Sequence, residues 1–172
     1  MKTAFVGLGA MGWPMALNLH KAKLLTAVYN RSYAKSEALA KETGCRAAKN
    51  LSELGDCEAV VLCVTADADV LAVVDALAAT LKSGALVLDC STVSAETARE
   101  AARRLKAKGV DFLDCPVSGG TEGAKHGTLA IMCGGDAAAF EKAQPLLQAL
   151  GKRLALMGPA GAGQATKAVN QI

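Results

Sequence analysis

The chain is poor in aromatic residues, and it lacks long uncharged apolar runs and runs of like charge. Aromatic residues make up 3% of its 172 residues, and hydrophobic residues of all kinds make up 52%. Because small aliphatic residues and glycine dominate, the composition favours helices packed closely on a sheet. No stretch reaches the roughly 18 apolar residues of a membrane-spanning helix. The net charge of +3 is spread along the chain, so we predict neither a nucleic-acid nor a membrane partner.

No CxxC pair occurs among the six cysteines, which are Cys45, Cys57, Cys63, Cys90, Cys115 and Cys133. The histidines His20 and His126 do not complete a metal site with them, and we predict no bound metal. Four of the cysteines lie in or beside apolar segments, which predicts buried free thiols in a reducing compartment. The apolar start of the chain ends at Gly7, too early for a secretory signal peptide. These features predict a cytoplasmic protein.

Short apolar segments alternate with segments of helical periodicity along the whole chain. The expected strands are Thr3–Val6, Leu24–Tyr29, Arg46–Ala48, Ala59–Val64, Ala85–Leu88, Val110–Leu113, Leu129–Cys133 and Arg153–Leu156. The expected helices are Met11–Lys21, Tyr33–Glu42, a brief one at Asn50–Glu53, Ala68–Leu81, Ser94–Lys108, Ala137–Leu150 and one beginning at Gly163. This alternation predicts βαβ units. We therefore expect an α/β fold of the Rossmann type with a doubly wound, mostly parallel sheet.

A glycine pattern, G-x-G-x-x-G, stands where the first expected strand gives way to the first expected helix. Its residues are Gly7, Leu8, Gly9, Ala10, Met11 and Gly12. In this context the first glycine permits a tight turn, the second lets the backbone approach a diphosphate, and the third lets the helix lie close on the strand. Free N–H groups at the helix start attract phosphate oxygens. The pattern predicts a dinucleotide-binding loop; the alternative is a glycine-rich turn without a ligand.

The end of the second expected strand indicates which dinucleotide is bound. An NAD site usually has Asp or Glu there to accept hydrogen bonds from the ribose hydroxyls. This chain has Asn30, Arg31 and Ser32 instead. Arg31 can make paired, charge-assisted bonds to a 2′-phosphate, and its neighbours can add donors. We predict NADP as the cofactor, with NAD as the alternative; a solvated loop arginine is the simpler reading of Arg31 alone.

Polar residues follow several other expected strands, where ligands of open α/β sheets bind. Thr65 follows Val64, Thr92 follows the fifth strand, and the segment Asp114–Gly120 follows the sixth. Within that segment, Ser118, Gly119 and Gly120 offer a hydroxyl and unhindered backbone N–H groups that suit a carboxylate. The alternative is an ordinary turn that contains a serine.

The last expected helix carries a lysine and an asparagine on one face. Lys167 and Asn170 are three residues apart, and Gly163 shares that face with Lys167. A lysine on an apolar helix face can extend its ammonium group to solvent. It can also act as an acid or base toward a substrate oxygen.

Together these segments resemble the β-hydroxyacid dehydrogenase family. The resemblance spans essentially the whole chain and is carried by the Gly7–Gly12 loop with its continuation to Leu19, by Asp114–Gly120 and by Gly163–Asn170. It implies hydride transfer between a nicotinamide cofactor and a short hydroxy or aldehyde acid of the 3-hydroxyisobutyrate, glyoxylate, succinic semialdehyde or tartronate semialdehyde class.

The resemblance also implies residue roles. Lys167 matches the catalytic lysine of the family. The substrate-contacting positions are Ser118, Gly119, Gly120 and Asn170, and the cofactor contacts near the nicotinamide are Val64, Thr65 and Thr92.

One departure from the family concerns the second domain. Members have an all-helical C-terminal domain after the helix that begins near Gly163, whereas this sequence ends at Ile172. Members also form homo-oligomers. We therefore expect residues 1–162 to be the dinucleotide-binding domain and residues 163–172 to be the truncated start of the interdomain helix, with little activity in this chain alone. Two alternatives are a non-catalytic dinucleotide-binding module and a related imine or ketoacid reductase, although the latter has a different residue in place of Lys167.

Overall fold

The computed structural model describes residues 1–170. Its strands are β1 (Thr3–Val6), β2 (Leu25–Tyr29), β3 (Arg46–Ala47), β4 (Ala59–Leu62), β5 (Leu86–Asp89), β6 (Asp111–Asp114), β7 (Val117–Ser118), β8 (Leu129–Gly134) and β9 (Gly151–Gly158). Its helices are α1 (Gly12–Lys21), α2 (Tyr33–Thr43), the 3₁₀ helix η1 (Leu51–Leu54), α3 (Asp67–Thr80), α4 (Ala95–Lys106), α5 (Gly120–His126), α6 (Ala137–Lys142), α7 (Gln144–Leu150) and α8 (Ala162–Asn170). None of the helices within this range is long and apolar enough to cross a membrane.

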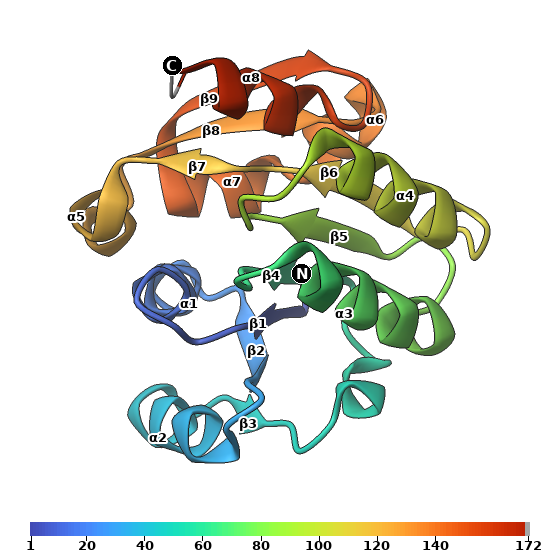
Figure 1. The fold of residues 1–172 in the computed structure, drawn as a ribbon. Helices are drawn as coiled ribbons and strands as arrows, with labels where there is room; N and C mark the ends of the chain where they lie inside the picture. Colours follow the sequence, from blue (N-terminus) through green and yellow to red (C-terminus); the bar gives the residue numbers. More distant parts are fainter. Residues whose placement is uncertain (171–172) are drawn as a thin grey trace.

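The strands form one sheet whose first six members are parallel. Their order is β3-β2-β1-β4-β5-β6, followed by β8 and β7, and β9 pairs with β8 (Figure 1). β8 runs antiparallel to β6 and β7, and β9 runs parallel to β8. Strands β1, β4 and β5 consist entirely of buried residues, as expected for parallel strands covered on both faces.

Helices cover both faces of the sheet, and alternate residues of each strand point to different cores. Phe5, Val61 and Leu113 pack toward the core made with α1, α2, α6 and α7. The residues next to them on the strands, Val6, Val60, Leu62 and Phe112, pack toward the core made with α3, α4 and η1. The predicted doubly wound, mostly parallel α/β fold is confirmed.

The structure differs locally from the sequence prediction at four places. The expected helix over 137–150 is two helices, because Pro145 has no N–H to donate and instead occupies the first turn of α7. β7 and α5 were not predicted, since a two-residue strand and a glycine-rich helix have weak sequence signals. β4 ends at Leu62 rather than Val64, which places Val64 in the loop beyond the strand. β9 is longer than expected, with an exposed edge.

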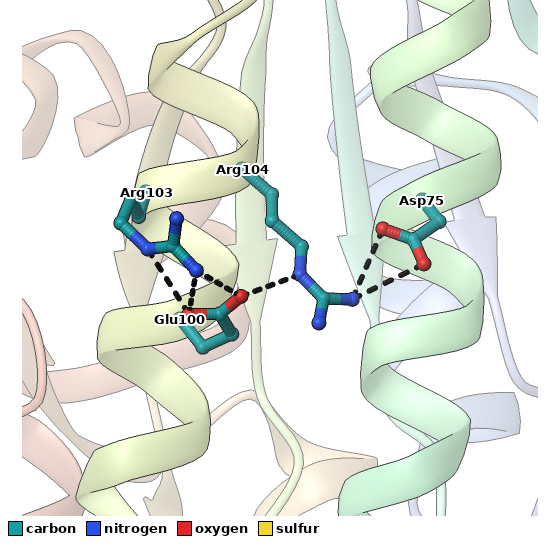
Figure 2. A network of polar contacts seen from close by, with 4 residues as sticks. All are labelled: Asp75, Glu100, Arg103 and Arg104. Atoms are coloured by element: carbon teal, nitrogen blue, oxygen red, sulfur yellow. Dashed lines mark hydrogen bonds and ion pairs between the residues drawn. The ribbon is translucent and has the colours of Figure 1, made fainter.

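A network of ion pairs joins α3 to α4 on the surface (Figure 2). Arg104 of α4 donates through Nε to Glu100, at 2.8 Å, and through Nη1 to Asp75 of α3, at 3.1 Å. Arg103 also donates to Glu100. Hydrogen bonds from both arginines lower the pKa of Glu100 to about 2. The carboxylate therefore stays ionised through mildly acidic conditions and holds Arg104, which links α4 to Asp75 of α3.

We predict that Glu100→Gln lowers stability slightly at neutral pH, because exposed pairs contribute little. A folded pKa near 2 lies below the ordinary value of 4.5, so this contribution is present above pH 4.5 and is lost as the pH falls toward 2. Urea midpoints at pH 7 and pH 3, compared with the exposed control Glu141→Gln, measure it. An equal deficit of Glu100→Gln at both pH values would contradict the assignment.

Candidate functional site

The turn between β1 and α1 has no room for side chains at two of its glycines. Gly7 has a φ of +96°, and a Cβ there would lie 2.1 Å from the carbonyl oxygen of Cys63. A Cβ on Gly12 would lie 1.8 Å from the carbonyl oxygen of Gly7. Both residues must be glycine for α1 to start directly against the end of β1. Gly12 is buried in this contact.

The middle of the same turn is open. A Cβ on Gly9 would meet nothing within 4 Å. The N–H groups of Gly9 and Ala10 have no hydrogen-bond partner within residues 1–170. They lie at the N-terminus of α1, where the helix dipole favours an anion. An open approach with free donors fits a diphosphate.

A cleft of about 640 Å³ begins at this turn and runs over the ends of β1, β2 and β4. Eight of the predicted cofactor residues line it: Gly7, Leu8, Gly9, Asn30, Arg31, Ser32, Val64 and Thr65. Its volume lies within the range of small-molecule sites. The sequence prediction thus brought together residues that are up to 58 positions apart in the chain, from Gly7 to Thr65.

Asn30 and Arg31 contribute to this cleft in different ways. Asn30 accepts a hydrogen bond from the Leu8 N–H through Oδ1 at 2.8 Å, and its Nδ2 donates to the Ser32 carbonyl at 3.1 Å. It therefore fixes the glycine turn to the end of β2. Arg31 extends into the cleft with 85% of its side chain exposed, and its guanidinium is accessible to a ligand.

Two charged residues of this cleft were missed in the sequence. Lys35, in the first turn of α2, and Asp69, in the first turn of α3, both line it beside Arg31. Lys35 lies four positions after Arg31, a spacing that offered a weak signal. Asp69 comes from a different βα unit, so only the folded chain places it there.

A second cleft of about 430 Å³ continues from the first and shares Cys63, Val64 and Thr65 with it. The predicted residues that line it include Met11, Thr92, Ser118, Gly119, Gly120 and Lys167. Lys167 donates through Nζ to the Val117 carbonyl at 2.8 Å, which places its ammonium group beside the Ser118–Gly120 backbone. Ala10 and Asn170 do not line either cleft; Asn170 donates to the Met132 sulfur at 3.5 Å.

A buried aspartate fixes the start of α8 and thereby the position of Lys167. Asp114, at the end of β6, accepts hydrogen bonds from the N–H groups of Gly161, at 2.8 Å, and Gln164, at 2.9 Å. Burial raises the pKa of Asp114, and the two N–H donors partly offset this effect. Gly163 allows the close approach, since a Cβ there would lie 2.3 Å from the Met132 carbonyl oxygen.

Gln164 ties α8 to the loop after β5. Its Nε2 donates to the Ser91 carbonyl at 2.7 Å, and its Oε1 accepts from the Val93 N–H at 3.2 Å. Ser91 Oγ in turn accepts from the Val64 N–H at 2.9 Å. The loops that carry Val64 and Thr92 and the helix that carries Lys167 therefore belong to one hydrogen-bonded unit.

A second buried aspartate is hydrogen-bonded to the loop after β5, which belongs to this unit. Asp89, at the end of β5, accepts from the Ser91 N–H through Oδ1 at 2.9 Å, while its Oδ2 has no partner in the described part of the chain. Burial raises the pKa of Asp89 to about 7. The sequence carried a signal for both aspartates, because each ends an apolar strand in the pattern Leu-Asp-Cys. An acidic residue at the end of a buried strand needs a hydrogen-bonding reason to be there.

We predict that alanine lowers stability at one glycine of the first turn and cofactor affinity at another. Gly12→Ala forces overlap with the Gly7 carbonyl, so it lowers the free energy of unfolding by about 2–3 kcal/mol. Gly9→Ala leaves stability nearly unchanged but weakens dinucleotide binding, because its Cβ occupies the open approach. Thermal melts and cofactor titrations of both variants measure this, and a stable Gly12→Ala would contradict the packing argument.

We also predict a pH-dependent effect of Asp89→Asn. Between pH 4 and pH 7 the unfolded carboxyl is ionised while the folded one keeps its proton, so stability attributable to Asp89 falls as the pH rises through this interval. The difference between wild type and Asp89→Asn changes by up to about 1.4 kcal/mol per pH unit. Urea denaturation from pH 5 to pH 8 measures it, with the exposed carboxylate of Asp75 replaced by asparagine as the control. Parallel profiles for wild type and Asp89→Asn would sink the assignment.

Comparisons with known proteins agree with this geometry. The sequence family described as the NAD binding domain of 6-phosphogluconate dehydrogenase matches residues 2–158 of the chain. The chain is 41% identical to the NAD-dependent L-serine dehydrogenase of Pseudomonas aeruginosa over 170 residues, covering 97% of this chain and 57% of that protein.

Solved structures give the same result. The Mycobacterium tuberculosis 3-hydroxyisobutyrate dehydrogenase with L-serine has a TM-score of 0.94 and 32% identity, covering 98% of this chain and 58% of that one. The structure of Psf3 in complex with NADP⁺ and 2-OPP has a TM-score of 0.88 and 31% identity, covering 98% and 61%. The chain thus spans about three fifths of the length of these relatives. By its fold, its glycine turn and these matches, the chain belongs to the β-hydroxyacid dehydrogenase family, as an NAD-binding domain of the 6-phosphogluconate dehydrogenase type.

Proposed function

We propose that this chain binds NADP and serves the reversible hydride transfer between that cofactor and a short β-hydroxy acid. The observation that carries the proposal is the place of Lys167. Its Nζ lies 2.8 Å from the Val117 carbonyl, in a cleft that is continuous with the predicted dinucleotide cleft. In a non-catalytic dinucleotide-binding module, a lysine of α8 would be expected to extend its ammonium group to solvent rather than into this cleft.

The residues of the second cleft divide the chemistry between them. NADP, when bound, supplies or accepts the hydride. Lys167 gives a proton to the developing alkoxide in the reductive direction and accepts the hydroxyl proton in the oxidative direction. The Ser118 hydroxyl and the backbone N–H groups of Gly119 and Gly120 bind the substrate carboxylate. Thr65 and Thr92 line the same cleft, and the nicotinamide binds beside them.

The preference for NADP rests on the cationic residues at the end of β2. Arg31 and Lys35 both line the cleft, and a guanidinium can bind a 2′-phosphate through two parallel hydrogen bonds. The related L-serine dehydrogenase is named NAD-dependent, and the structure of Psf3 is a complex with NADP⁺, so relatives of both kinds exist.

Three further properties belong to the same proposal. The substrate is of the 3-hydroxyisobutyrate, glyoxylate, succinic semialdehyde or tartronate semialdehyde class. The intact protein is a homo-oligomer, for which the exposed apolar side chains of Met157 and Val169 provide contact surface. The protein works in the reducing cytoplasm, where its six free cysteines stay reduced. Residues 171 and 172 of the expected interdomain helix lie outside the described residues.

The cofactor is tested on the 172-residue chain by fluorescence titration with NADPH and NADH. We expect NADPH to bind about tenfold more tightly, and Arg31→Ala to remove that advantage, because a charge-assisted hydrogen bond contributes about 1.5–3 kcal/mol. Arg153→Ala, at an exposed position of β9, is the matched control. Equal or tighter binding of NADH by the wild type would refute the NADP assignment.

The catalytic role is tested on the full-length gene product with glyoxylate, succinic semialdehyde and 3-hydroxyisobutyrate as substrates. Lys167→Ala should lower kcat about 10²–10⁴-fold, the usual contribution of general acid–base catalysis, and leave the Kd for NADPH unchanged. Lys125→Ala, an exposed lysine on α5, controls for the loss of charge. Unchanged turnover in Lys167→Ala would remove the proton-transfer role.

A further inference from the structure

Arg31 is paired with an acidic residue inside the dinucleotide cleft. Its Nη2 donates to Asp69 Oδ1 over 2.9 Å. Arg31 lies just beyond β2 and Asp69 lies in the first turn of α3, so the ion pair spans the cleft that both residues line. The residue that we assign to the 2′-phosphate therefore already has a negatively charged partner.

Asp69 does not join two helices, unlike Asp67, the other acidic residue in the first turn of α3. Asp67 accepts hydrogen bonds from the Ser94 N–H, at 3.0 Å, and from the Thr97 hydroxyl, at 2.7 Å, and so fixes α3 to α4. Asp69 has no hydrogen-bond partner other than Arg31 among residues 1–170. Its carboxylate is free to act on whatever occupies the cleft.

The pair is weak enough for a ligand to open. Arg31 is 85% and Asp69 31% exposed, and water screens pairs of this kind. A 2′-phosphate carries about −1.5 to −2 charges and offers several acceptor oxygens, so it can replace the carboxylate on the guanidinium. The displaced carboxylate remains close by, and its negative charge opposes the phosphate.

A ribose without the phosphate meets the same carboxylate favourably. Free ribose hydroxyls donate hydrogen bonds to a carboxylate. In NAD sites, the acidic residue at the end of the second strand accepts these bonds. β2 is followed by Asn30, Arg31 and Ser32, with no acid, but α3 brings one into the cleft. We propose that Asp69 is a specificity-determining residue that weakens binding of NADP and favours NAD. This inference rests on the proposed function, because it requires Arg31 to face the 2′ position.

The test is a titration of wild type, Asp69→Asn and Asp69→Ser with NADPH and NADH. We expect both variants to bind NADPH about two- to fivefold more tightly, the range of an exposed charge interaction, and to bind NADH equally or more weakly. The gain should shrink in 0.5 M salt, since screening weakens the repulsion. Asp75→Asn removes the same charge from the same helix outside the cleft, where Asp75 pairs with Arg104, and should leave both affinities unchanged.

The outcomes separate the two proposals. If wild type binds NADPH and Arg31→Ala weakens that binding, but both Asp69 variants bind like wild type, the inference about Asp69 is overturned and the proposed cofactor stands. If Asp75→Asn raises the NADPH affinity as much as Asp69→Asn, the effect is one of net charge and the inference is overturned as well. If wild type binds neither nucleotide, both proposals fall. Thermal melts of the two Asp69 variants confirm that the titrated protein is folded.

Discussion

The cofactor half of the site depends on a contact between two backbones that leaves no space for a side chain. At Gly12 the start of α1 touches the Gly7 carbonyl, so this contact fixes how closely the helix approaches the end of β1. The free N–H groups at Gly9 and Ala10 lie at the helix start that this contact positions. Asn30 then secures the turn from the neighbouring strand through the Leu8 N–H. The anion-binding geometry is thus built into the backbone before any charged residue takes part.

The second cleft, which we propose to bind the substrate, is organised by buried polar groups. Asp89 and Asp114 are partners in the register between β5 and β6, and both are fully buried. Each satisfies backbone N–H groups of the segment above it, and Gln164 joins those segments to each other. Because breaking buried hydrogen bonds leaves unsatisfied groups at high cost, Lys167 is held at a defined place over the cleft.

The sequence predicted those parts of the molecule that are encoded locally. The alternation of apolar and amphipathic segments predicted the parallel strands and most helices, and the glycine pattern located the turn, because strand burial and turn sterics act over a few residues. It did not predict β7, α5 or the break before Pro145, where short, glycine-rich or proline-containing segments depend on their neighbours.

In the candidate site, too, the sequence predicted local features but not those that depend on distant segments. Residues near strand ends, such as Arg31, Thr65 and Ser118, were predicted because parallel strands bring their carboxyl ends to one edge. Asp69 was not predicted: the absence of an acid after β2 suggested a cleft without a carboxylate, but α3 supplies one from 38 residues away. Likewise the anchoring roles of Asp114 and Gln164 require contacts across 50 residues that no local pattern encodes.

The antiparallel strands beyond β6 have a mechanical consequence. β7 pairs with β8 past the end of the parallel strands, so the backbone of Ser118 forms part of a sheet rather than of a free loop. The adjoining α5 is attached to α1, where buried Asn18 donates to the Ala124 carbonyl at 2.6 Å. Hydrogen bonding thus connects the segment that carries Ser118 to α1, the helix that follows the glycine turn. Within this domain the backbone at Ser118 is therefore held from two sides, directly by β8 and, through α5, by α1.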